Sequence, residues 1–139
     1  MQDKYIVWTT IKSSRYPLCL TIDAADTLEK MFGSVGQIGK SVADHAEKDE
    51  IGEMLRVVLS ALRPLAEAGK KYLAANAALA GEDAGQLPDL PDDETLRAVL
   101  SGAEIVEVWG DVFRALRGGT SREVEAAPDN SVKNGESAM

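Results

Sequence analysis

The sequence predicts an α+β fold that is mostly α-helical, in which an N-terminal β-hairpin packs on a small bundle of about four to five helices. Two β-branched and aromatic runs within residues 5–22 are typical of a hairpin. Residues 51–62 and 105–116 both repeat apolar side chains at helical spacing. The 139 residues suit one domain. We place this domain at residues 1–118 and expect residues 119–139, which lack apolar periodicity, to be a flexible polar tail.

The expected strands are YIVWTTIK (5–12) and YPLCLTI (16–22), with SSR between them as the loop. Pro17 cannot donate to a ladder, so we expect it at the start of an edge strand. A lone hairpin is marginal in water, and its apolar face therefore needs a helix to pack on. The residues of that face are Leu18, Leu20 and Ile22.

Residues 23–33 are expected to supply this helix, with Asp23 as its N-cap and Gly33 as its left-handed end. Its apolar side consists of Ala24, Leu28, Met31 and Phe32. Residues 34–48, which are rich in glycine and charge, are expected to form a short helix or a loop.

Two longer helices carry apolar stripes of matching geometry. The first stripe consists of Ile51, Met54, Leu55, Val58, Leu59 and Leu62. The second consists of Ile105, Val108, Trp109, Val112, Phe113 and Leu116. Each stripe is wide enough to face a core, so we expect the two helices to pack together with the hairpin. The second helix has a capping box from Ser101 to Glu104 and a stop at Gly118-Gly119.

The segment between these helices has three parts. Residues 64–81 predict an alanine-rich helix that Pro64 either starts or kinks. An acidic linker at residues 81–91 follows, and then a short helix at 93–100 with Asp92 as its cap.

The stretch GSVGQIGKS (33–41) invites comparison with a phosphate-binding loop, G-x-x-x-x-G-K-[ST]. Counting back from Gly39, the first glycine position holds Ser34, and Gly33 is one residue too early. The motif also has to follow a buried parallel strand, whereas a helix precedes it here. We therefore interpret the stretch as a flexible glycine-rich connector.

No other group of residues predicts catalysis or metal binding. The acidic run lacks the alternating carboxylates and central glycine of a calcium loop, and we interpret it as a solvated linker with a helix cap. His45 is the only histidine, and Cys19 is explained as a small half-buried hydrophobe. We expect no catalytic residue, metal or cofactor, and a protein that is not an enzyme. The acidic run comprises Glu82, Asp83, Asp89, Asp92, Asp93 and Glu94. Two glutamate pairs lie in no predicted pocket: Glu29 with Glu53, and Glu104 with Glu107.

The composition favours a protein-binding role. A net charge of −8 argues against nucleic-acid binding, and no apolar stretch reaches the length of a membrane span. The N-terminus lacks a basic segment followed by an apolar run, so we expect a cytosolic location. With 19 alanines and only 5% aromatic residues the core is thin, and a partner surface would add stability. Candidate interface residues are Trp8, Tyr72, Trp109 and Phe113, with core packing as the other interpretation of Trp109.

Over about residues 1–125 the order of segments resembles the small tail assembly chaperones of long-tailed bacteriophages and prophages. The similarity lies in LTIDAADTLEKMFGS, the alanine-rich middle, and EIVEVWGDVFRALRGGTSREVE before a polar tail. The resemblance implies a non-enzymatic protein that coats the helical tape-measure protein and delivers it to tail-tube subunits in the host cytoplasm. It also implies absence from the mature virion. A homo-oligomer is compatible with it, and no functional residue carries over.

A different class of protein stays open. A small acidic regulatory or adaptor protein, for instance an antitoxin-like one, would neutralise a basic protein partner through the acidic linker. Neighbouring genes for a tail tube and a tape-measure protein would favour the chaperone, and an enzyme is the third interpretation.

Overall fold

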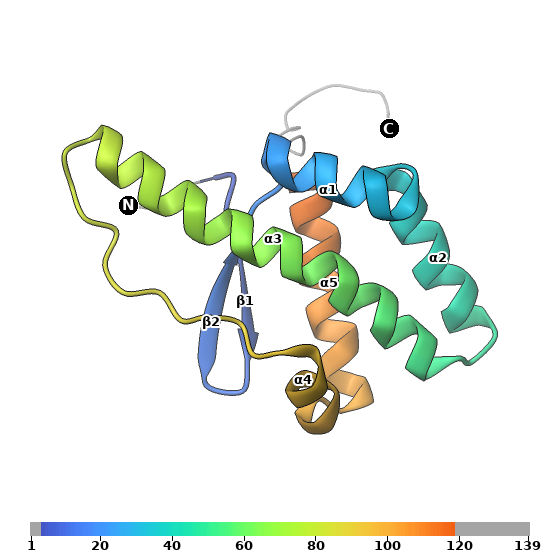
Figure 1. The fold of residues 1–139 in the computed structure, drawn as a ribbon. Coiled ribbons are helices and arrows are strands. Elements are labelled where there is room, and N and C mark those ends of the chain that lie inside the picture. Colours follow the sequence, from blue (N-terminus) through green and yellow to red (C-terminus); the bar gives the residue numbers. More distant parts are fainter. Residues whose placement is uncertain (1–3, 119–139) are drawn as a thin grey trace, which may run out of the picture.

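The structure, a computed structural model, describes residues 4–118 and has the predicted α+β, mostly helical architecture (Figure 1). An antiparallel hairpin is followed by helices α1 to α5, and the prediction of a tail at 119–139 lies outside the described residues. The elements are β1 (Val7–Ile11), β2 (Ser14–Leu18), α1 (Ile22–Phe32), α2 (Val35–Glu47), α3 (Ile51–Leu79), α4 (Asp93–Val99) and α5 (Gly102–Gly118).

Helix α3 runs through the centre of the molecule, and the other elements surround it (Figure 1). Helices α1 and α2 lie along one side, and α5 crosses α3, while β2 packs on α3 and β1 on α5. The two predicted stripes meet in one core, where Val58, Leu62 and Val112 are completely buried. Thr9, also completely buried, donates a 2.8 Å hydrogen bond to Asp111 Oδ2 and so ties β1 to α5.

Only part of each predicted apolar stripe is buried. Ile51 is 48% exposed and Phe113 is 38% exposed, while Trp109 is only partly buried against the core. These side chains lie at the ends or edges of the stripes, where neighbouring elements no longer cover them.

The hairpin differs from the prediction in its turn and in the end of its second strand. Ile11 pairs with Ser14, so the turn is Lys12-Ser13 rather than the expected SSR loop, and Lys12 has a positive φ of 58°. Strand β2 ends at Leu18. Pro17 pairs with Trp8 inside the ladder and not at the strand start, which a two-stranded sheet allows because both strands are edges.

Capping explains why the strand stops early. Thr21 Oγ1 accepts a 3.2 Å hydrogen bond from the Ala24 N–H, so Thr21, and not Asp23, is the N-cap of α1. Ile22, expected on the apolar face of a strand, is the first residue of the helix and is 88% exposed. The prediction of the Gly33 end is confirmed by its φ of 91°.

Cys19 is buried rather than half-buried, and its backbone joins the hairpin to α3. The Cys19 N–H donates to the Leu65 carbonyl at 3.1 Å. A direct bond between a strand end and a helix backbone requires a very close approach. Gly69, one turn beyond Leu65, permits it, because a Cβ at residue 69 would lie 2.0 Å from the Pro17 carbonyl oxygen.

The structure narrows two alternatives that the sequence left open. Residues 34–48, expected as a short helix or loop, form α2, a regular helix with Ile38 and Val42 buried. Pro64 does not start a new helix but lies inside α3, which is continuous for 29 residues. Tertiary packing on both sides of Pro64 outweighs its low helix propensity.

The predicted caps of the last two helices are confirmed. Asp92 Oδ1 accepts from the Thr95 N–H at 2.8 Å and starts α4. Glu104 Oε1 accepts from the Ser101 N–H at 2.9 Å, while Ser101 Oγ accepts from the Glu104 N–H at 3.2 Å. The Ser101 N–H, and then the Lys12 ammonium at 3.1 Å, hold the pKa of Glu104 below its usual value.

Candidate functional site

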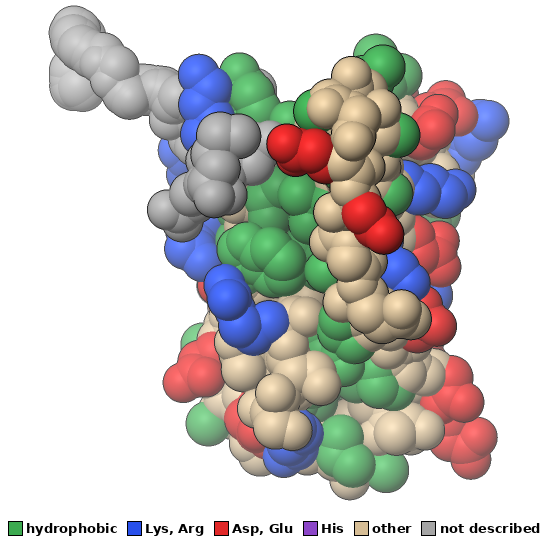
Figure 2. All heavy atoms as spheres, turned by 90° about the vertical axis from the view of Figure 1, so that its left-hand side faces the viewer, with side chains coloured by type: hydrophobic (Ala, Val, Ile, Leu, Met, Phe, Trp, Pro, Cys, Tyr) green, Lys and Arg blue, Asp and Glu red, His purple; other side chains and the backbone are tan. Residues whose placement is uncertain are grey.

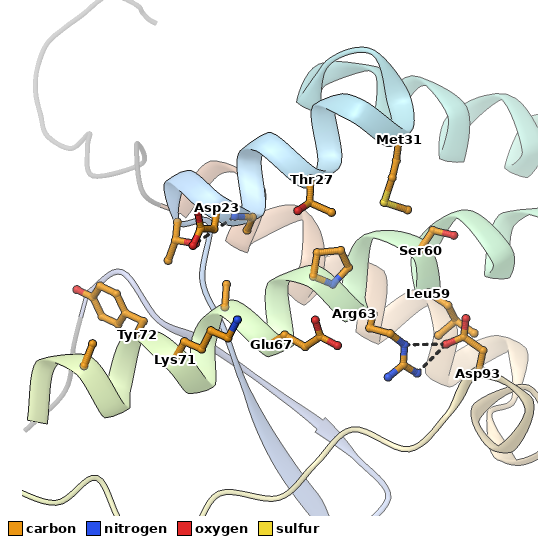
Figure 3. A pocket seen from close by; sticks show the side chains of 15 residues that line it. Asp23, Thr27, Met31, Leu59, Ser60, Arg63, Glu67, Lys71, Tyr72 and Asp93 are labelled. Atoms are coloured by element: carbon orange, nitrogen blue, oxygen red, sulfur yellow. Dashed lines mark hydrogen bonds and ion pairs between the residues drawn. The ribbon is translucent and has the colours of Figure 1, made fainter. Parts of the chain in front are cut away.

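A groove of about 600 Å³ lies between α1 and α3 (Figure 3). Its floor is apolar: Ala24, Leu59 and Ala68 are buried, and Pro64 is half-buried between them. The exposed Met31 stands at one end of the groove and the half-buried Tyr72 at the other. Small side chains facing each other on the two helices leave the space open.

The groove follows the two helix axes. Its lining residues recur every four positions, at 23, 27 and 31 on α1 and at 59, 63, 67, 71 and 75 on α3. At 1.5 Å per residue these spans are about 12 Å along α1 and about 24 Å along α3. The groove is therefore an elongated channel several helical turns long, and not a compact cavity.

Pro64 gives the floor a polar feature. Proline has no N–H, so the Ser60 carbonyl lacks the donor that residue i+4 supplies elsewhere in a helix. The Ser60 side chain lines the same wall. The Ser60 hydroxyl therefore offers a bound molecule a hydrogen-bonding group beside the apolar floor.

The charged side chains of the groove fall into two groups. Arg63 is already engaged, since its guanidinium donates to Asp93 Oδ1 at 2.7 Å and to the Pro91 carbonyl at 2.6 Å. The side chains of Asp23, Glu67 and Lys71 form no hydrogen bond or ion pair within residues 4–118. Two free carboxylates against one free ammonium make the rim net negative.

The four predicted interface residues lie at three separate places. Tyr72 lines the groove, whereas Trp8 lies on β1 with the Arg15 guanidinium 4.6 Å from its ring centre. Trp109 and Phe113 are neighbours on α5, with ring centres 5.5 Å apart. The 60% exposed Val106 lies one turn before Trp109, so α5 has a second, outward apolar strip made of Val106, Trp109 and Phe113.

The face toward which the C-terminal end of α3 points is also partly apolar (Figure 2). Hydrophobic side chains gather in its centre, and Leu79 at the end of α3 is 87% exposed. Apolar side chains outside the core therefore occur in several places among residues 4–118, and the groove combines them with the larger of two hollows.

The residues considered for chemistry do not come together in a site. The stretch 33–41 closes α1 and opens α2, so no strand precedes it, and Lys40 is an exposed helix residue. His45 Nδ1 lies 2.7 Å from Glu50 Oε1 at the exposed α2–α3 joint. Residues 4–118 contain no group of three or more His, Cys, Asp or Glu side chains that could hold a metal ion. The glutamates of the two considered pairs line neither this groove nor the smaller pocket beneath the linker.

We expect neither the wild-type protein nor the Lys40→Ala variant to bind ATP, so neither should give an ATP-dependent heat in calorimetry. Gly33 ends α1, and Gly36 and Gly39 belong to α2, so the N–H groups of these glycines do not converge on one point as a phosphate-binding loop requires. ATP binding that is lost in the Lys40→Ala variant would overturn this interpretation.

Sequence reasoning missed most of the groove residues. Asp23 was interpreted as a cap, and Thr27, Glu67 and Lys71 carried no motif. The available signal was Ala24 facing Ala68 across two helices, but their facing depends on which helices pack together.

No protein-family model, curated protein or solved structure matches this chain. Among the helices of residues 4–118, none combines the length and the apolar character needed to cross a bilayer.

Proposed function

We propose that this chain is a non-enzymatic tail assembly chaperone of a long-tailed phage or prophage. In this role it binds the tape-measure protein and recruits tail-tube subunits in the host cytoplasm, and it is absent from the mature virion. The sequence resemblance in LEKMFG and VFRALRGGTSREVE supports the class. The observation that carries the proposal is the open groove between α1 and α3, which has the length and the apolar floor that a helical protein partner requires.

The acidic adaptor is the second candidate, and the placement of the acidic run weakens it. Asp89 pairs with Lys70, whose hydrogen bond lowers the pKa of that carboxyl. Asp92 caps α4, and Asp93 holds Arg63. Two of the six carboxylates therefore fasten the linker and α4 to α3, and a third caps α4, which leaves fewer of them to neutralise a basic partner.

The test is co-expression with the tape-measure protein encoded beside this chain. We expect that protein to be recovered in soluble form, and co-purified, when this chain is present, and to aggregate when it is absent. The tail-tube protein should join the complex as a third component.

A matched control expresses the tape-measure protein with an unrelated acidic helical protein of similar size. Equal recovery with the control would show a non-specific effect. A genomic neighbourhood without tail genes, or tape-measure protein that stays insoluble in both cases, would refute the proposed function. Copurification of a basic toxin-like neighbour would favour the adaptor.

A further inference from the structure

We infer that the groove between α1 and α3 binds an amphipathic helix whose apolar residues recur at i, i+4 and i+8 and whose flank is basic. Assigning this helix to the tape-measure protein rests on the proposed function. The specificity for a basic flank is an inference from the groove itself.

The spacing of the groove, together with its two helical walls, favours a helix as the occupant. The lining residues of α3 follow one another at four-residue intervals over about 24 Å, so they present a row of equally spaced contacts. An amphipathic helix has the same repeat on its apolar face and can place one side chain against each turn of the wall. The same-face side chains of an extended strand repeat every ~6.6 Å, close to this spacing, but the backbone N–H and C=O groups of a strand would find few partners between two helices that bond their own backbone internally.

The small side chains of the floor set the kind of anchor that fits. Ala24 and Ala68 line the groove from opposite helices and are already buried, so residues 4–118 leave the space above them unfilled. Leucine or methionine side chains of the occupant fill such space without moving the backbone. The Ser60 hydroxyl, which lines the groove, can bond a polar side chain of the occupant between two anchors.

Charge determines the flank of the occupant. Asp23 on α1 and Glu67 on α3 are exposed, unpaired and on the rim of the same groove, whereas Arg63 is neutralised by Asp93. A lysine or arginine beside the apolar face of the occupant would meet these carboxylates. An acidic flank would meet two like charges and only Lys71 as a counterion.

The experiment measures fluorescence anisotropy of two labelled peptides of about 18 residues. Both have leucine at i, i+4 and i+8, and they differ only in lysine or glutamate at the flanking positions. We expect the lysine peptide to bind with at least about tenfold higher affinity, since like charges across an interface oppose binding. Equal affinity of the two peptides would refute the basic flank, and no binding of either would refute the groove as a helix site.

Because the whole chain carries a net charge of −8, any basic peptide is attracted to it, and the variants must separate this attraction from the groove. Asp23→Asn with Glu67→Gln is expected to weaken binding of the lysine peptide by about three- to tenfold, from two exposed ion pairs. Glu29→Gln with Glu53→Gln removes the same charge from the same two helices outside the groove and should change affinity less than about twofold. Equal losses in both double variants would refute the site.

A steric variant tests occupancy without changing charge. Thr27 is exposed and lines the groove, so Thr27→Trp should fill the space, lower the affinity by more than about tenfold and keep the circular dichroism melting curve. Ala75→Trp, at another exposed lining position, replaces it if that variant does not fold. A change of sedimentation coefficient in either variant would make a second copy of this chain the occupant and overturn the inference. Tighter peptide binding after removal of residues 119–139 would make that segment of the chain the occupant and would also overturn the inference.

The two proposals fail in different ways. If the tape-measure protein copurifies equally well with the groove variants, the groove is wrong and the chaperone function stands. If the lysine peptide binds the groove but the tape-measure protein does not bind, the helix site stands and the helix that occupies it comes from a different partner protein.

Discussion

Gly69→Ala should lower the free energy of unfolding by about 3 kcal/mol or more, the upper range for an overpacked site. An alanine Cβ at this position would lie 2.0 Å from the Pro17 carbonyl oxygen and 2.5 Å from its carbon. Both are backbone atoms, and the strand that carries them is fixed by the Cys19 N–H bond to Leu65 and by the completely buried Leu18. The hairpin would have to leave α3. Urea denaturation followed by circular dichroism measures the loss.

Helix propensity alone would make a glycine-to-alanine change in a helix stabilising, whereas Gly69→Ala is expected to destabilise. A matched glycine-to-alanine control elsewhere therefore separates the clash from helix propensity. Gly110 lies in the interior of α5 and is exposed, and a Cβ added there would meet no atom of another element within 4 Å. Gly110→Ala should therefore raise the free energy of unfolding by about 0.5–1 kcal/mol, the ordinary gain of alanine over glycine in a helix. If Gly69→Ala were as stable as Gly110→Ala, the hairpin would not approach α3 as closely as described.

The features that the sequence predicted correctly are local ones. The capping box at Ser101 and Glu104 and the Asp92 cap depend on side chains three residues apart, and the structure contains these hydrogen bonds. That each of the two apolar stripes turns toward a core was also predictable, because each stripe is too broad to stay exposed. These features do not depend on the exact placement of distant segments.

The errors occurred where two local rules compete or where a distant contact decides. The Lys12-Ser13 turn contains none of the Asn-Gly or Asp-Gly pairs that mark two-residue turns, and Lys12 adopts a positive φ without being glycine. Because proline has a low helix propensity, the sequence left open whether Pro64 starts a helix or lies inside one. The packing of α3 on β2, α1 and α5 keeps the helix continuous. The groove depends on α1 lying beside α3, which no short motif encodes.

Val112→Asp is the second substitution with a large expected effect, and we expect it to leave the protein unfolded at 25 °C. Val112 is completely buried on α5 within the common core, and Arg114, two residues further along the helix, already donates to Asp111. An unpaired carboxylate there costs several kcal/mol on top of the lost apolar burial. The sum is comparable to the total stability of a small domain, about 5–15 kcal/mol. Loss of the helical circular dichroism signal is the measurement.

The same substitution at Val106 separates burial from helix effects. Val106 is on the same helix but 60% exposed, so Val106→Asp should change the free energy of unfolding by less than about 0.5 kcal/mol. Unfolding of Val106→Asp would mean that the outward strip of α5 is covered in solution, by a second copy or by a partner. A Val112→Asp variant that stays folded but no longer binds the tape-measure protein would place the second stripe at an interface instead of in the core. In that case α5 would not pack on α3 as described, and the position of α3 in the groove between α1 and α3 would no longer be explained.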